Sequence, residues 1–196
     1  MSSQTLQLAP AALLIAAGTL TPGPNNFVVM RTAAQRGFAA ATPTIVAITL
    51  GSVMLLALAS SGAGAALAKW PLLQHAIAIG GCLYLLWLGV VLMRAPPATT
   101  ELATHDSALG WFAFQLLNPK AWAMTLTLVA TQAPAPPWEI FRQLAPLYAG
   151  MAALALASWA LLGGVLRHLD LRPEQRRWID RVLGASLALG AALLLF

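Results

Sequence analysis

Charged residues are scarce in this sequence. Only 9% of its 196 residues are Asp, Glu, Lys or Arg, whereas about 25% is usual for a soluble domain. Hydrophobic residues make up 59%, and the mean hydropathy is +0.75. So little charge cannot cover a globule in water, which excludes a water-soluble enzyme and a disordered tail. The composition predicts an integral membrane protein.

Cysteine is nearly absent as well. The single cysteine, Cys82, lies in an apolar run, which excludes an intramolecular disulfide, a CxxC redox pair and a cysteine metal cluster. We expect it to be a small buried side chain. The three histidines are too dispersed for a metal site, and no apolar segment pairs a nucleophile with a histidine or carboxylate base. The sequence therefore predicts no metal, no cofactor, no catalytic residue and a protein that is not an enzyme.

Acidic residues are the rarer charges, six against eleven basic ones, so the net charge is +5. This excess could suggest a nucleic-acid partner. The basic residues are spread between apolar runs, however, and are not massed on one polar face. We therefore predict contact with membrane lipid and no nucleic-acid partner.

Long apolar runs are what the sequence has in abundance. A helix needs about 20 mostly apolar residues to span a bilayer. Six such segments fill nearly the whole chain, at roughly 6–30, 38–60, 71–93, 109–130, 143–166 and 179–196. The last is the weakest, because Asp180 and Arg181 lie at its start and must stay near the membrane interface. The expected fold is an all-α bundle of six transmembrane helices in a single domain, 1–196.

The distribution of lysine and arginine predicts the orientation. With six spans, the polar stretches 31–37, 94–108 and 167–178 share one side of the membrane. Eight of the eleven basic residues lie in or beside these stretches. Cytoplasmic loops carry an excess of Lys and Arg, so we expect these stretches in the cytoplasm and both termini outside, in a multi-pass membrane protein.

Two of the six segments are interrupted by proline. The first contains the run Thr21-Pro22-Gly23-Pro24-Asn25-Asn26, and the fourth contains Asn118-Pro119-Lys120. Proline removes a backbone donor and clashes with the preceding turn, so a regular helix cannot pass. The freed carbonyls must be buried in protein or line a wet cavity. At 1.5 Å per residue both breaks lie about 13 to 16 Å from an end of their segment, near the middle of the bilayer.

The two interruptions open two halves of three segments each, about 1–95 and 108–196. Because three is odd, the second half crosses the membrane in the opposite sense. This arrangement predicts two inverted three-helix repeats, with helices 1 and 4 broken near the midplane, and it is typical of transporters. A kink between packed helices would explain one proline equally well. The first run, however, has two prolines, and the other run has a lysine inside the membrane. This combination favours a binding site.

Polar side chains gather at the breaks. A charge as deep as that of Lys120 costs at least about 2.5 to 3.5 kcal/mol, so it must face a cavity, a substrate carboxylate or broken-helix carbonyls. Helix N-termini and Lys120 could hold a carboxylate, and freed carbonyls an ammonium. That combination describes a zwitterion, although another small polar solute would satisfy the same groups. The candidate translocation residues are Thr21, Pro22, Gly23, Pro24, Asn25, Asn26, Tyr84, Gln115, Asn118, Pro119 and Lys120. For Tyr84, core packing is an open alternative to lining the cavity.

Four runs resemble the lysine exporter family of the LysE/RhtB type. They are Thr21-Pro-Gly-Pro-Asn-Asn26, Gly81-Cys-Leu-Tyr-Leu-Leu-Trp-Leu-Gly89, Leu117-Asn-Pro-Lys-Ala121 and Arg181-Val-Leu-Gly-Ala185. The resemblance covers nearly the full length, in the right order. It implies six hydrophobic segments in a bacterial inner membrane and proton-driven export of amino acids or close relatives. The family's motif positions fall on Pro22, Gly23, Pro24, Asn25, Gly81, Tyr84, Trp87, Gly89, Asn118, Pro119 and Lys120.

The chain departs from the family's pattern in its second segment. Many relatives have an acidic residue after a glycine in the second segment, where this chain has Gly51-Ser52. Proton coupling would then use Lys120 or an interfacial acid, or the protein would be a facilitator.

The expected function is a secondary exporter of an amino acid or close derivative that works by alternating access. One alternative is export of another small metabolite or of a cation. The other is a membrane scaffold that transports nothing. Small residues such as Gly184 and Gly190 permit close helix packing but do not define a homo-oligomer.

Overall fold

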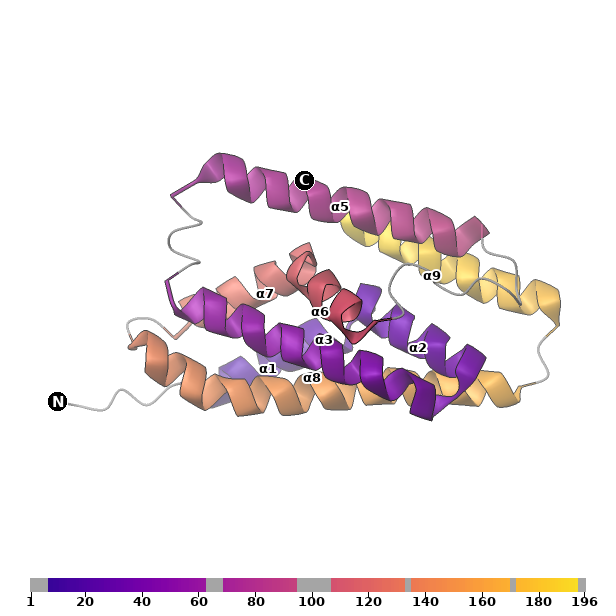
Figure 1. Cartoon of the computed structure of the whole chain (residues 1–196), viewed down its shortest axis with the longest axis horizontal. Coiled ribbons are helices and arrows are strands. Elements are labelled where there is room, and N and C mark those ends of the chain that lie inside the picture. Colours follow the sequence, from indigo (N-terminus) through magenta and orange to yellow (C-terminus); the bar gives the residue numbers. More distant parts are fainter. Residues whose placement is uncertain (1–6, 63–68, 95–106, 133–134, 170–171, 194–196) are drawn as a thin grey trace.

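The computed structural model describes residues 7–62, 69–94, 107–132, 135–169 and 172–193, which form eight helices and no strand (Figure 1). The helices are α1 Leu8–Leu20, α2 Pro24–Arg36, α3 Phe38–Ser60, α5 Pro71–Arg94, α6 Ala108–Leu116, α7 Pro119–Ala130, α8 Pro137–His168 and α9 Pro173–Leu193. In Figure 1, α1 with α2, and α6 with α7, each make one pass along an elongated bundle, so the helices correspond to the predicted apolar segments. The all-α fold class is confirmed.

Proline begins the second half of both broken passes. α1 ends at Leu20 and α2 begins at Pro24, while α7 begins at Pro119 after α6 ends at Leu116. A proline at the first helical position lacks only an N–H that would have no intrahelical partner. α1 and α2 have 13 residues each, so the first break falls in the middle of its pass. Both predicted breaks are confirmed.

Several predicted segment ends are wrong. The stretch 31–37 is helical through Arg36, and most of 167–178 is helical because α9 begins at Pro173. α8 likewise begins at Pro137 instead of 143. Polar residues are compatible with helix continuation, so polarity alone does not end a helix. Of the predicted stretch 94–108, residues 95–106 lie outside the described residues.

Two charged residues, Arg31 and Asp180, pair within the bundle. Arg31 was expected in a loop, which is wrong, because it lies within α2. The expected place of Asp180 near the membrane interface stays a prediction. Both lie within helices, and Nη1 of Arg31 is 3.4 Å from Oδ1 of Asp180, with exposed fractions of 4% and 16%. Each charge can be buried because the other compensates it, a pairing across about 150 residues that segment-by-segment analysis does not detect.

The core forms two clusters, one on each side of the first break. The first gathers buried side chains of α2, α3, α6 and α8, including Phe27, Trp111 and Leu156. The second gathers those of α1, α3, α7 and α8, including Ile15 and Leu128. The two halves of each broken pass therefore pack in different clusters, and the breaks lie between them.

α5 and α9 pack chiefly on each other, along one side of the bundle (Figure 1). They meet at Gly89 and Gly184, where a Cβ atom on Gly184 would lie 2.5 Å from the carbonyl oxygen of Gly89. Such glycines allow helix backbones to approach closely. Cys82 on α5 is buried and free, as predicted.

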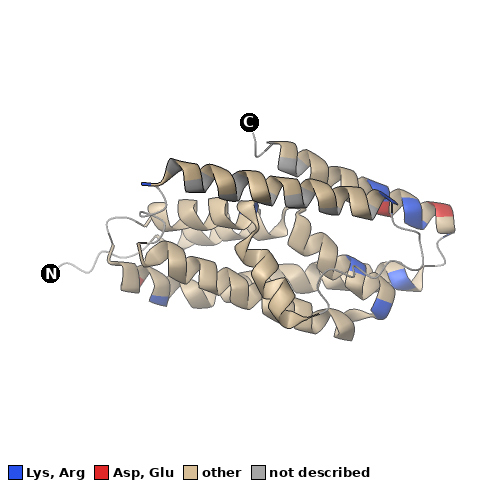
Figure 2. Cartoon of the chain, turned by 45° about the horizontal axis from the view of Figure 1, so that its top comes forward, with Lys and Arg blue, Asp and Glu red and all other residues tan. Residues whose placement is uncertain are grey.

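The surface is apolar along the bundle and charged at its ends. Among the described residues, α3 and α8 are long and apolar enough to cross a bilayer, and α1 is a shorter apolar helix. Figure 2 shows most Lys and Arg at the end where α9 begins and few at the opposite end. This matches the expected asymmetry of basic residues, while the assignment of that end to the cytoplasm stays a prediction.

Candidate functional site

The break between α1 and α2 lies against the break between α6 and α7. Nζ of Lys120, in the first turn of α7, donates to Oγ1 of Thr21 at 2.9 Å, to the carbonyl of Thr21 at 3.1 Å and to that of Pro22 at 3.4 Å. A lysine ammonium has three donors, and all three have acceptors here. Of the surroundings considered from the sequence, the structure shows the broken-helix carbonyls, and Lys120 also lines a cavity.

The other carbonyls at the end of α1 also have partners. Nδ2 of Asn26 donates to the carbonyls of Thr19 and Thr21, both at 2.9 Å. Nε1 of Trp159, on α8, donates to the carbonyl of Leu20 at 3.3 Å. The oxygens that the prolines free from the helix are thus satisfied inside the protein, as an apolar surrounding requires.

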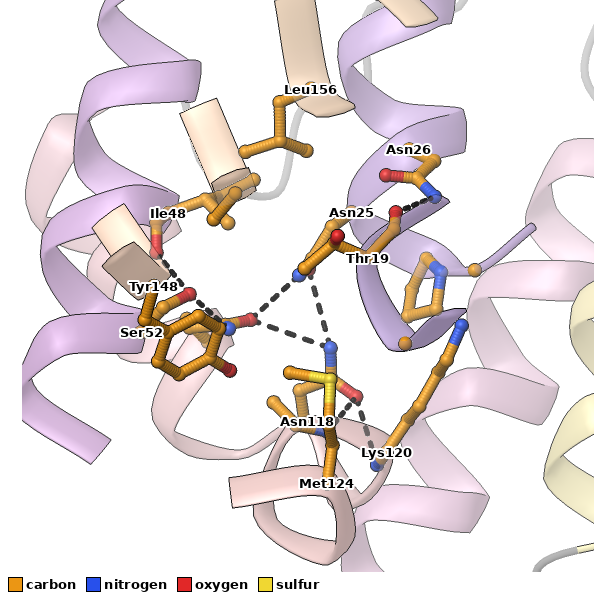
Figure 3. Close-up of a pocket in the computed structure, with 16 residues that line it drawn as sticks. Thr19, Asn25, Asn26, Ile48, Ser52, Asn118, Lys120, Met124, Tyr148 and Leu156 are labelled. Atoms are coloured by element: carbon orange, nitrogen blue, oxygen red, sulfur yellow. Dashed lines mark hydrogen bonds between the residues drawn. The ribbon is translucent and has the colours of Figure 1, made fainter. Parts of the chain in front are cut away.

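A network of amides joins the two breaks to α3. Nε2 of Gln115 donates to Oγ of Ser52 at 2.7 Å, and Nδ2 of Asn25 donates to Oε1 of Gln115 at 2.9 Å. Nδ2 of Asn118 donates to Oδ1 of Asn25 at 3.3 Å and to Oε1 of Gln115 at 3.4 Å. In Figure 3, Asn25 and Asn118 point toward each other across the site. Satisfied buried networks of this kind hold side chains in one arrangement.

Asn118 also begins α7. Its Oδ1 accepts from the backbone N–H of Lys120 at 3.1 Å and of Ala121 at 3.4 Å, as an N-cap does. The N-cap of α2 is Gly23, which has no side chain. The partial positive charge at the start of α2 is therefore left to interact with the cavity.

A cavity of about 40 Å³ lies at this junction. Its wall contains Gly18, Thr19, Gly23, Pro24, Asn25, Asn26, Ile48, Ser52, Gln115, Asn118, Lys120, Ala121, Met124, Tyr148, Ala152 and Leu156 (Figure 3). Lys120 supplies the charge, and none of these described wall residues is acidic. The volume suits a few water molecules.

The cavity brings together most of the predicted residues. Gly23, Pro24, Asn25, Asn26, Gln115, Asn118 and Lys120 line it. Thr21 and Pro22 lie behind Lys120 as its acceptors, and Pro119 is buried at the start of α7. Tyr84 belongs to α5, but its side chain lies outside the described part of the structure, so its role stays a prediction.

Sequence analysis missed several wall residues. Ser52 was noted only as a departure from the family, although a hydroxyl in an apolar run was a usable signal. Tyr148, one of two tyrosines, is buried on α8 with its hydroxyl 3.2 Å from Oγ1 of Thr125. Gly51 permits the whole arrangement, because a Cβ atom there would lie 2.8 Å from Cβ of Gln115.

The sequence matches one family model and several curated proteins. The family described as LysE type translocator matches residues 16–196. A cysteine/O-acetylserine efflux protein of Escherichia coli (strain K12) is 26% identical over 155 residues, which cover 76% of this chain and 78% of that protein. The protein of the same name from Escherichia coli O157:H7 is 26% identical over 156 residues, with the same coverage of 76% and 78%. No solved structure gives a significant match.

Proposed function

The chain belongs to the LysE type translocators, and from this premise we propose that it exports a small neutral amino acid, or a close derivative, across the bacterial inner membrane. Relatives are named cysteine/O-acetylserine efflux proteins. At neutral pH both of those solutes carry one carboxylate, one ammonium and no further charge. They are the class of solute that we assign to the cavity.

The observation that carries this proposal is the amide network with Lys120 beside it. Asn25, Gln115 and Asn118 come from both breaks and converge on one cavity. The ammonium of Lys120 disfavours a second cation, and the described wall residues include no carboxylate to compensate one. A lysine-like side chain would therefore be repelled, whereas Ile48, Met124 and Ala152 suit a small apolar one.

In the structure the Lys120 ammonium contacts the carbonyls of Thr21 and Pro22. We assign one charge of the zwitterion to each side of this contact. The substrate carboxylate takes the Lys120 ammonium and the amides at the start of α2. The substrate ammonium takes the carbonyls of Thr21 and Pro22, which Lys120 then releases. The exchange leaves every charge and every carbonyl with a partner. Little free energy is therefore lost when the substrate separates Lys120 from α1.

Alternating access is proposed from the same contact between Lys120 and the end of α1. The cavity is too small for an amino acid, so binding must part the half-helices, and the breaks are the hinges available for that movement. In Figure 1 the pass made by α1 and α2 runs opposite to the pass made by α6 and α7, which supports the proposal that 1–95 and 108–196 are inverted repeats. We place the arginine-rich end in the cytoplasm and both termini outside.

Efflux from proteoliposomes tests the function. Vesicles that contain the full chain are loaded with labelled cysteine, O-acetylserine, serine or lysine, at two external pH values. We expect the neutral solutes to leave faster than from protein-free vesicles and lysine to be retained. Efflux of lysine alone would refute the assigned class, and equal retention of all four solutes would favour a non-transport scaffold.

A further inference from the structure

A second pocket, of about 60 Å³, lies away from the central cavity, at the arginine-rich end of the bundle. Like the central cavity, it must widen before it can hold an amino acid. It lies between α2, α8 and α9, and its wall includes Arg31, Gln35, Leu166, Arg176 and Asp180. Arg31 follows Asn25 by six residues on the same helix, which is about 9 Å along the axis. A solute in this pocket is therefore close to the central cavity.

The guanidinium of Arg31 is buried but incompletely paired. Only 4% of the side chain is exposed, and no described residue accepts a hydrogen bond from its Nε or Nη1. The contact of Nη1 with Asp180 is 3.4 Å long and uses one carboxylate oxygen. Arginine forms its stronger pairs with carboxylates through two parallel N–H donors, and this arrangement leaves such donors unused.

Buried N–H groups of a charged side chain are costly when they lack an acceptor. If the pair served only to hold α9 on α2, tighter bidentate geometry would serve better. Arg31 also belongs to the wall of this pocket, which points instead to an additional acceptor. Because Asp180 is part of the same pocket, a simple anion would meet a negative charge. A ligand with both a carboxylate and an ammonium meets a complementary group at each end.

We propose that this pocket is a loading site for the exported solute, with its carboxylate on Arg31 and its ammonium on Asp180. The inference rests on the proposed function, since it assigns a second site to the same substrate class. The zwitterion replaces one intramolecular ion pair with two intermolecular ones, so neither buried charge is left alone. Basic residues at this end attract carboxylates, and this is the end that we place in the cytoplasm, from which an exporter takes its substrate.

Equilibrium binding to the full chain in nanodiscs tests the proposal. The probe is radiolabelled cysteine under reducing conditions, and the nanodiscs contain phosphatidylethanolamine and phosphatidylglycerol. We expect about two bound cysteines per wild-type chain, one for each pocket, and about one for the double variant Arg31→Gln/Asp180→Asn. The double variant removes both charges together, so it leaves no unpaired buried charge to unfold the protein.

Two further variants separate a loading site from a structural ion pair. Arg31→Lys keeps the ion pair with Asp180 but lacks the forked donors, so we expect the affinity of the second site to fall about tenfold. A purely structural pair would tolerate this change. Arg177→Gln removes a charge of the same sign from the exposed neighbouring position and should leave both sites unchanged.

Several outcomes would overturn the proposal. One is about one bound cysteine per wild-type chain, with the same value in the double variant. Another is loss of all binding in the double variant. A third is a second site that is detected only in nanodiscs without phosphatidylethanolamine, because the head group of that lipid would then be the occupant. Efflux by the wild-type chain is measured separately. Efflux with a single binding site refutes the loading site alone, whereas absence of efflux refutes the proposed function.

Discussion

The ammonium of Lys120 lies 2.9 Å from the hydroxyl oxygen of Thr21, a residue 99 positions earlier in the chain. The contact joins the first turn of α7 to the residue that follows the last turn of α1. It places a positive charge at the carbonyl end of α1, which carries a partial negative charge. One lysine therefore both caps a broken helix and supplies the charge of the central cavity, and substrate binding must change its partners.

Replacement of Lys120 by methionine is expected to abolish most of the efflux. The change keeps the length and apolar stem of the side chain but removes the ammonium that we assign to the substrate carboxylate. Loss of one charge-assisted hydrogen bond weakens binding by about tenfold to a hundredfold. Initial efflux rates of cysteine from proteoliposomes, normalised to inserted protein, measure the effect.

Lys69→Met is the matched control for this variant. Lys69 is exposed and lies outside the cavity wall, just before α5, so its loss should leave efflux unchanged. Circular dichroism of both variants checks that the helices are retained. A folded Lys120→Met protein with wild-type efflux would remove Lys120 from the site.

Gln115→Leu is expected to destabilise the bundle and to stop transport. Gln115 is 2% exposed and bonds to Ser52 and Asn25. Without it, Asn25 on α2 and the buried Ser52 on α3 each lose a partner, which costs about 1 to 3 kcal/mol. A thermal melt in detergent should show a lower midpoint, whereas Gln143→Leu, at a partly exposed site on α8, should melt close to wild type. Equal midpoints would mean that the network adds no stability.

The breaks could be predicted from the sequence because proline acts locally. Pro22, Pro24 and Pro119 interrupt a helix whatever surrounds them, and hydropathy identified the apolar segments almost completely. The partner of Lys120 could not be selected, because carbonyls, a cavity and a carboxylate all satisfy a buried ammonium. The pairing of Arg31 with Asp180 was missed for a related reason. Arg31 alone indicates a loop and Asp180 alone an interface, and only packing between distant helices shows that they compensate each other.

Gly51→Ala is expected to lower the melting temperature, although alanine is the better helix former. A Cβ atom at Gly51 would lie 2.8 Å from Cβ of Gln115 and 3.2 Å from the carbonyl oxygen of Phe112, so α6 would have to move away from α3. Gly150→Ala is the control, because a Cβ atom there meets no described atom within 4 Å. It should raise stability by about 0.5 to 1 kcal/mol through helix propensity alone. If the two variants melt alike, α3 and α6 do not need their close approach.

Ser52→Asp is expected to shift the preference of the exporter toward cationic amino acids. Oγ of Ser52 lies 2.7 Å from Nε2 of Gln115 in the cavity wall, so a carboxylate there keeps a hydrogen-bond donor. It also offsets the positive charge of Lys120, and the repulsion that excludes a second cation disappears. The ratio of lysine efflux to cysteine efflux in the same proteoliposomes should rise about tenfold, whereas Ser52→Asn, of matched size and without charge, should leave the ratio as in wild type. An equal rise in both variants would assign the preference to cavity shape and refute the electrostatic argument.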